Sequence, residues 1–166
     1  MNYVFELAKK EEIPEIFSLY KERVQWMENN GFHQWNETDY LNTYQEPYFE
    51  GHLEKERLFV LRDSASDKIA AAAVLLEQDP RWPEDMEGTA YYVHNLVTGC
   101  ETRGAGTQML KYLEKLAADR GKDYIRLDCT EGHEFLNQYY EARGYNVVGS
   151  CVDKLYHGIL RQKRTR

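Results

Sequence analysis

The pattern of apolar and polar residues is clearest in the middle of the chain, where it predicts a strand, a loop, a helix and a second strand. Residues 91–98 form an apolar run typical of a strand, and residues 101–106 follow as a glycine-containing loop. Apolar residues then recur at helical spacing, and Arg120-Gly121 ends that run. Residues 124–128 read as a short strand. A strand, helix and strand in this order predict two parallel neighbours joined by a right-handed crossover.

A second helix with a distinctive ending follows this unit. Its apolar residues lie on one side, and Arg143-Gly144-Tyr145 ends it before a strand predicted over residues 145–152. Residues 154–160 are expected to pair as a final strand. The basic residues 161–166 are expected to form a solvated tail.

The N-terminal half reads more coarsely. The apolar and polar side chains of residues 3–7 alternate as in a strand. An apolar stripe then predicts a helix that ends at Asn30-Gly31. A second helical region, rich in tyrosine, is expected to break at Pro47. Trp35 lies on the loop between the two, where it can either stack against a substrate or cap the core.

A predicted hairpin and a predicted loop separate these helices from the strand at residues 91–98. Residues 57–62 and 69–76 read as two strands, and the turn between them is rich in residues that bond their own backbone. Residues 78–88 contain two prolines and are expected to form a loop. We keep this loop as a candidate border of the active site.

Composition agrees with a single compact domain over residues 1–166. The chain has a mass of 19.6 kDa, 42% hydrophobic residues and no apolar run long enough to cross a bilayer, so a cytoplasmic protein without membrane contact is expected. Three widely spaced cysteines fit neither a zinc pattern nor a disulfide framework, and we expect free thiols. The net charge of -7 disfavours nucleic acid and favours cationic small molecules or basic peptides.

The loop at residues 101–106 indicates a site for a phosphorylated cofactor. Glycine permits a tight turn, and the positive end of the following helix dipole faces any anion bound in the loop. A dinucleotide fingerprint would need a third glycine where Met109 stands, and an ATP-type loop would need Gly-Lys-Ser/Thr, which is absent. The two glycines by themselves support a simple strand-to-helix turn as well as they support a phosphate-binding loop.

Two motifs in the expected order resemble the GNAT family of N-acetyltransferases. The loop at residues 101–106 looks like the family's acyl-coenzyme A signature, and residues 140–145 look like its Tyr-x-x-x-Gly-aromatic ending. The motif-bearing part covers residues 89–149. The resemblance implies an α/β (α+β) fold, with a central mixed twisted sheet of about six or seven strands and helices on both faces. It also implies direct transfer of an acetyl group from acetyl-coenzyme A to an amine.

The resemblance implies a role for several residues. Tyr140 is the expected proton donor, since a phenol with a pKa of about 10 is protonated at neutral pH. The adjacent Tyr139 is the residue most easily mistaken for it. Glu101 departs from the usual Gln or Arg, which leaves its charge to be offset by an arginine or by backbone amides. The expected cofactor contacts are Leu96, Val97 and Thr98 with the pantetheine arm, Arg103, Gly104, Ala105, Gly106 and Thr107 with the pyrophosphate, and His133 and Asn137 beyond them.

Other questions stay open from sequence. His94, Asp128 and Glu131 are all candidates for the general base, and no metal cluster is visible. A nucleophilic Cys129 is disfavoured, because direct attack needs no acyl-enzyme. The acceptor is expected to be a small cationic amine, with Trp35 as a candidate contact and a protein amine as the alternative. A non-catalytic acyl-coenzyme A sensor and an unrelated nucleotide-binding domain also remain open, as does a homodimer.

Overall fold

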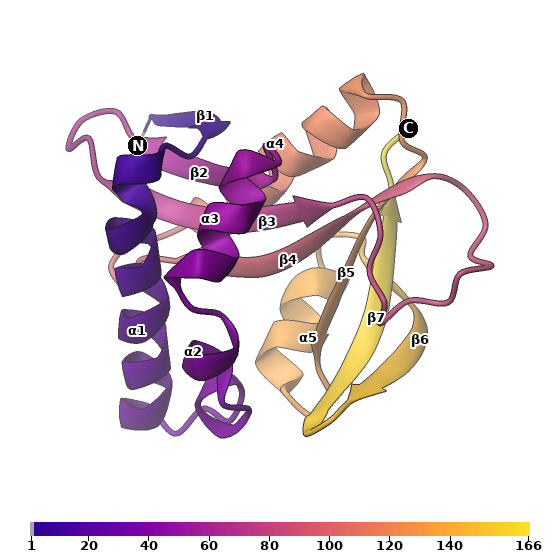
Figure 1. Ribbon diagram of the computed structural model, residues 1–166. Coiled ribbons are helices and arrows are strands. Elements are labelled where there is room, and N and C mark those ends of the chain that lie inside the picture. Colours follow the sequence, from indigo (N-terminus) through magenta and orange to yellow (C-terminus); the bar gives the residue numbers. More distant parts are fainter. Residues whose placement is uncertain (1) are drawn as a thin grey trace. The chain divides into compact units, whose positions relative to one another are not determined.

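The computed structural model describes residues 2–166, which contain one seven-stranded sheet in the order β1-β2-β3-β4-β5-β7-β6 (Figure 1). The strands are β1 Tyr3–Leu7, β2 Leu58–Asp63, β3 Ile69–Leu76, β4 Ala90–Thr98, β5 Tyr124–Thr130, β6 Asn146–Asp153 and β7 Tyr156–Arg164. The helices are α1 Ile13–Asn29, α2 Tyr40–Thr43, α3 Glu46–Glu54, α4 Ala105–Asp119 and α5 Glu134–Glu141, with short 3₁₀ turns at Lys10–Glu12 and Trp35–Glu37.

The sheet is mixed, as the sequence predicts. The pairs β1–β2, β2–β3, β5–β7 and β6–β7 are antiparallel, whereas β4 and β5 are parallel. The parallel pair confirms the crossover through α4, because two parallel strands need a long connection between them. Strand β7 lies between β5 and β6, so the last strand of the chain is an interior strand and β6 forms the edge of the sheet.

The chain forms two compact units. The first consists of the residues up to Leu75 together with Asn95–Tyr112, and the second of Leu76–His94 and Leu113–Arg166. Strand β4 and helix α4 each contribute residues to both units.

The core of the first unit gathers around the β2–β3 hairpin. All residues of β3 except the last are buried, including its run of four alanines. Phe5 of β1 stacks on Phe59 of β2 and on Tyr112 of α4, with both pairs of ring centroids 5.2 Å apart. Stacked aromatic pairs of this kind add to the burial of apolar area that stabilises the unit.

The second unit corrects the expected basic tail. Strand β7 continues through Arg164, so residues 161–164 pair with β5, and residues 161 and 162 also pair with β6, instead of extending into solvent. Arg161 is only 5% exposed, and its guanidinium donates to the carbonyl of Tyr145 at 2.9 Å and to the amide oxygen of Asn137 at 3.1 Å. These acceptors satisfy a charge that would be costly to bury alone.

The break expected at Pro47 lies earlier. Helix α2 ends at Thr43, and Pro47 stands in the first turn of α3, where its missing N–H leaves no helical hydrogen bond unmade. Within residues 2–166, no helix has the length and apolar character that spanning a membrane requires.

Candidate functional site

The predicted phosphate-binding loop follows β4 and ends in α4. Gly104 has a φ of +76°, a left-handed conformation that other L-residues rarely adopt, and a Cβ built there would meet nothing within 4 Å. Helix α4 begins at Ala105, so Gly106 belongs to its first turn. The N–H groups of a first helical turn have no partner within their own helix, and they carry the positive end of its dipole. The junction therefore presents backbone donors beside the exposed Arg103.

A left-handed residue inside β4 shapes the strand before this loop. Asn95 has a φ of 54° and is buried, and three tyrosines of the first unit bind it. The Tyr20 hydroxyl donates to the Asn95 carbonyl at 2.5 Å, and the Tyr48 hydroxyl donates to its Oδ1 at 2.7 Å. The Asn95 Nδ2 donates to the Tyr40 hydroxyl at 2.5 Å. We call these four residues the Asn95 clamp.

Arg23 of α1 holds the end of β4. Its Nη2 donates to the carbonyl of Thr98 at 2.9 Å and to the Thr98 hydroxyl at 3.0 Å. Its guanidinium also stacks over the ring of Trp26, 4.9 Å from the centroid. The first turn of the loop is closed by Thr102, whose hydroxyl donates to the carbonyl of Gly99 at 2.8 Å. These contacts fix the backbone that leads from the strand into the loop.

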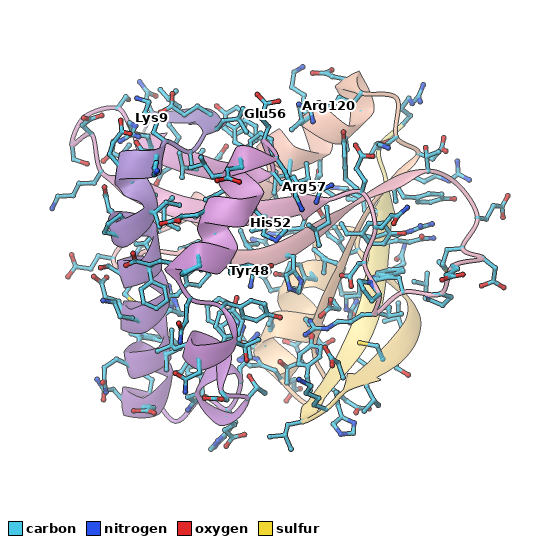
Figure 2. All side chains as sticks on the ribbon, viewed as in Figure 1. Lys9, Tyr48, His52, Glu56, Arg57 and Arg120 are labelled. Atoms are coloured by element: carbon cyan, nitrogen blue, oxygen red, sulfur yellow. The ribbon has the colours of Figure 1, made fainter. Side chains whose placement is uncertain are left out.

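Trp35 packs within the aromatic cluster around the Asn95 clamp. Its ring stacks on Tyr40 with centroids 4.3 Å apart and lies 5.8 Å from the ring of Tyr20. Trp35 is half-buried, so part of it reaches solvent. Figure 2 labels Tyr48 and His52, which lie one turn apart on α3 with their rings edge to face at 4.6 Å. Contact between Trp35 and a substrate stays a prediction.

In the second unit, the tyrosine motif ends α5 with a Schellman turn. The N–H of Tyr145 donates to the carbonyl of Tyr140 at 3.1 Å, and the N–H of Gly144 donates to that of Glu141 at 3.0 Å. Gly144 has the positive φ, +85°, that this ending requires. The Tyr145 hydroxyl donates to Glu114 at 2.8 Å, which anchors the turn to α4.

Tyr140 is buried in the second unit, with its ring edge-on to those of Tyr139 and Tyr145. Burial raises the pKa of the Tyr140 phenol well above 10, and the neighbouring Cys129 raises it further. Burial likewise raises the pKa of the Cys129 thiol to about 11. At neutral pH both groups therefore keep their protons.

His133 and Asn137 bind other parts of the second unit. His133 caps α5, because its Nδ1 accepts from the N–H of Leu136 at 3.2 Å. The amide nitrogen of Asn137 donates to the carbonyls of Thr130 and His133, and its oxygen accepts from Cys129 Sγ at 3.2 Å as well as from Arg161. Both residues thus stabilise the start of α5, and their contact with a cofactor stays a prediction.

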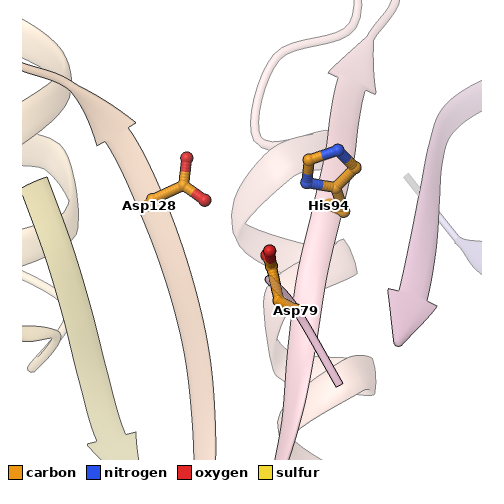
Figure 3. Close-up of side chains that lie close together, drawn as sticks. All are labelled: Asp79, His94 and Asp128. Carbon is orange, nitrogen blue, oxygen red and sulfur yellow. The ribbon is translucent and has the colours of Figure 1, made fainter. Parts of the chain in front are cut away.

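A cluster that the sequence only partly indicated lies in the same unit. The donor atoms of Asp79, His94 and Asp128 all lie within 4.8 Å of one another. Figure 3 shows the carboxylate of Asp128 on β5 facing the imidazole of His94 on β4, with Asp79 beside them. Burial lowers the pKa of His94 below its ordinary 6.5, although Asp128 and Asp79 oppose this shift, and burial raises the pKa of Asp79.

Asp128 is held by two side chains. The hydroxyl of Tyr156 and the Nη1 of Arg81, the latter at 3.3 Å, both donate to its Oδ1, and its side chain is 6% exposed. Arg81 also donates through Nε to Asp153 at 3.2 Å, and its guanidinium lies 4.3 Å from the ring centroid of Tyr156. The cluster is thus a network of fixed charges.

Comparison with known proteins identifies the chain. The model of the acetyltransferase (GNAT) family matches residues 11–145. The chain belongs to the GNAT family. Among curated proteins, it is similar to the uncharacterized N-acetyltransferase YesJ of Bacillus subtilis (strain 168), with 25% identity over 150 residues that cover 86% of this chain and 81% of that protein.

Solved structures agree with this membership. A GNAT acetyltransferase from Listeria monocytogenes 4b F2365 has 25% identity and a TM-score of 0.80, covering 98% of this chain and 94% of its own. The PaiA N-acetyltransferase of Thermoplasma acidophilum, solved in complex with coenzyme A, has 12% identity and a TM-score of 0.76, with 99% of each chain covered. The expected GNAT fold is confirmed, and as a member of this family the chain is an acyltransferase.

The GNAT site candidates fall into two groups. The first unit holds the strand segment Leu96, Val97 and Thr98 and the loop residues Arg103, Gly104, Ala105, Gly106 and Thr107, whereas the second holds His133, Asn137 and Tyr140. Sequence reasoning missed Arg23, Asp79, Arg81 and Tyr156. For Asp79 and Arg81 a signal existed, because both lie in the proline-containing loop that was a candidate border of the active site.

Proposed function

We propose that this GNAT protein transfers an acetyl group from acetyl-coenzyme A directly to the primary amine of a small molecule. The observation that carries the proposal is the junction at Gly104. This left-handed glycine directly precedes the first turn of α4, whose backbone N–H groups have no partner within the helix and can bind an anion. A PaiA relative of the same fold was solved with coenzyme A, which supports the choice of cofactor.

The loop fits a diphosphate in its shape and its donors. The space within 4 Å of the Cβ position of Gly104 is open, and the exposed Arg103 supplies a cation next to it. The side chain of Glu101 is also exposed, so its charge can remain in water. The backbone of Leu96, Val97 and Thr98 would bind the pantetheine arm like an added strand, and one N–H there would polarise the thioester carbonyl.

Tyr140 would give a proton to the departing thiolate. A group that donates a proton must first hold it, and burial keeps the Tyr140 phenol protonated across the physiological range; the same raised pKa makes the phenol a weaker acid, so its proton goes to a strong base such as the departing thiolate. The same burial keeps Cys129 a thiol, with its pKa at about 11, which disfavours an acyl-enzyme on sulfur. Direct attack by the amine on the thioester therefore suits this unit better than a two-step transfer.

The acceptor class rests on charge. The net charge of -7 favours a small cationic amine, and a protein amine is the alternative acceptor. A panel of aliphatic amines, amino sugars, polyamines and lysine peptides, incubated with acetyl-coenzyme A and analysed by mass spectrometry, would identify the acceptor. Binding of coenzyme A without any acetylated product would favour a non-catalytic sensor.

The role of Tyr140 has a matched control in Tyr139. Tyr140→Phe should lower turnover by at least about tenfold while the affinity for coenzyme A stays nearly constant. Tyr139→Phe, one residue away and under the guanidinium of Arg143, should retain turnover. Equal turnover in wild type and Tyr140→Phe would remove Tyr140 from this role.

A further inference from the structure

The structure distinguishes the three sequence candidates for the general base. Glu131 lies exposed in the turn after β5. Asp128 is nearly buried, and its Oδ1 accepts from both Tyr156 and Arg81, which fixes this carboxylate beside His94. His94 faces two carboxylates, Asp128 and Asp79, whose negative charge can stabilise the imidazolium that a proton transfer would create.

We propose that His94 accepts the proton of the acceptor amine and that Asp79 and Asp128 stabilise the resulting imidazolium. This inference rests on the proposed acetyl transfer and adds to it the group that takes the acceptor's proton. It also adds Asp79, which sequence reasoning did not single out. Asp128 is then a positioning residue, and Arg81 and Tyr156 fix its orientation.

The acceptor loses two protons during the reaction, one before the attack and one after it. An ammonium ion gives one proton to a ring nitrogen of His94, which frees the nitrogen lone pair. The C–N bond forms at the thioester carbon, and the C–S bond breaks as Tyr140 gives its proton to the sulfur. The nitrogen loses a second proton, which restores the Tyr140 phenol. The products are the acetamide and the thiol of coenzyme A, and the proton on His94 leaves to water.

The charges around His94 suit this task. Burial lowers the pKa of His94 below the ordinary 6.5, so the imidazole is neutral at pH 7, and Asp128 and Asp79 oppose this lowering and keep the ring more basic than burial alone would. The charged groups that face it are Asp79 from the loop after β3, Asp128 from β5, Arg81 from the same loop and Asp153 from β6. As pH falls through the pKa of His94, the imidazole becomes protonated and activity should be lost.

A proton-transfer network explains the cluster better than a metal site. Three donors within 4.8 Å could also suit a divalent cation, but the Arg81 guanidinium lies 3.3 Å from Asp128 and would repel one. The hydroxyl of Tyr156 also binds the same carboxylate oxygen. Transfer that is abolished by EDTA and restored by a divalent cation would overturn our reading of the cluster.

The test compares two acceptors in one variant. Wild type and His94→Gln are assayed with the aliphatic amine found in the panel and with its aminooxy analogue, which is already neutral at pH 7. His94→Gln should lower kcat for the aliphatic amine by about a hundredfold or more. The loss for the aminooxy analogue should be less than about tenfold, since no first deprotonation is needed. His157→Gln, which changes an exposed histidine on β7, should match wild type with both acceptors.

The outcomes separate this inference from the function on which it rests. Wild type that acetylates no amine overturns both. Wild type that acetylates the amine, with equal losses for both acceptors in His94→Gln or with no loss, overturns the role of His94 alone. Should His94→Gln fail to fold, Asp128→Asn provides the second test. Removing that negative charge should move the acid limb of the wild-type pH profile to lower pH, and an unchanged limb would contradict the proposal.

Discussion

Replacing Asn95 by alanine tests how the Asn95 clamp holds β4. The change removes the acceptor of the Tyr48 hydroxyl and the donor to the buried Tyr40 hydroxyl. It also places alanine at a φ of 54°, a conformation that asparagine tolerates better. An unsatisfied buried polar group costs about 1–3 kcal/mol, and the left-handed backbone costs alanine about 1–2 kcal/mol.

We therefore expect Asn95→Ala to lose about 3 kcal/mol of unfolding free energy, which for a domain of this size lowers Tm by about 6–12 °C. Asn95→Gly is the matched control, because it loses the same side-chain hydrogen bonds but accepts the positive φ. It should be about 1 kcal/mol more stable than Asn95→Ala. Urea denaturation and scanning calorimetry measure both differences.

The same variants bear on the proposed function, because Leu96, Val97 and Thr98 follow Asn95 directly. A backbone released from the clamp should raise the KM for acetyl-coenzyme A more than it lowers kcat. Two results would refute the reasoning: equal stability of Asn95→Ala and wild type, or equal stability of the alanine and glycine variants. The second would mean that the left-handed backbone stores no strain.

Three further predictions test other parts of the structure. Gly104→Ala should destabilise the protein by about 1–2 kcal/mol and weaken coenzyme A binding, because alanine disfavours the positive φ. Gly51→Ala is the control: a Cβ there also meets nothing within 4 Å, and within α3 it should stabilise the protein by about 0.5–1 kcal/mol. Thermal melts with and without coenzyme A measure both effects. Arg161→Lys should cost about 2 kcal/mol in urea unfolding, because an ammonium cannot replace both guanidinium contacts, and an unchanged midpoint would contradict this. At pH 8 a thiol reagent should modify the exposed Cys100 first and spare Cys129, since a pKa of about 11 leaves about one thiolate in a thousand; Cys100→Ser should abolish the fast phase.

Local patterns in the sequence predicted most of the fold. Apolar periodicity predicted β3 with its observed bounds and the ends of α4 and α5 within two residues, because each pattern depends only on near neighbours. Gly144 was read correctly as the end of α5, since the left-handed turn there is a local requirement.

Long-range contacts could not be predicted in this way. Residues 161–164 look like a basic tail by composition, and only their position between β5 and β6 explains why Arg161 is buried. The link between Asn95 and Tyr20 spans 75 positions, and no local pattern marks it. The sequence marked His94 and Asp128 only as separate candidates and did not mark Asp79, and only the fold brings the three together.

The most direct test of the central claim is a calorimetric titration of the protein with coenzyme A up to millimolar concentration. The proposed cradle at Arg103 and Gly104 predicts one-to-one binding with measurable heat, and little or none with ATP or NAD at the same concentration. Absence of heat with coenzyme A, or stronger binding of ATP or NAD, would contradict the proposal that this GNAT protein uses acetyl-coenzyme A.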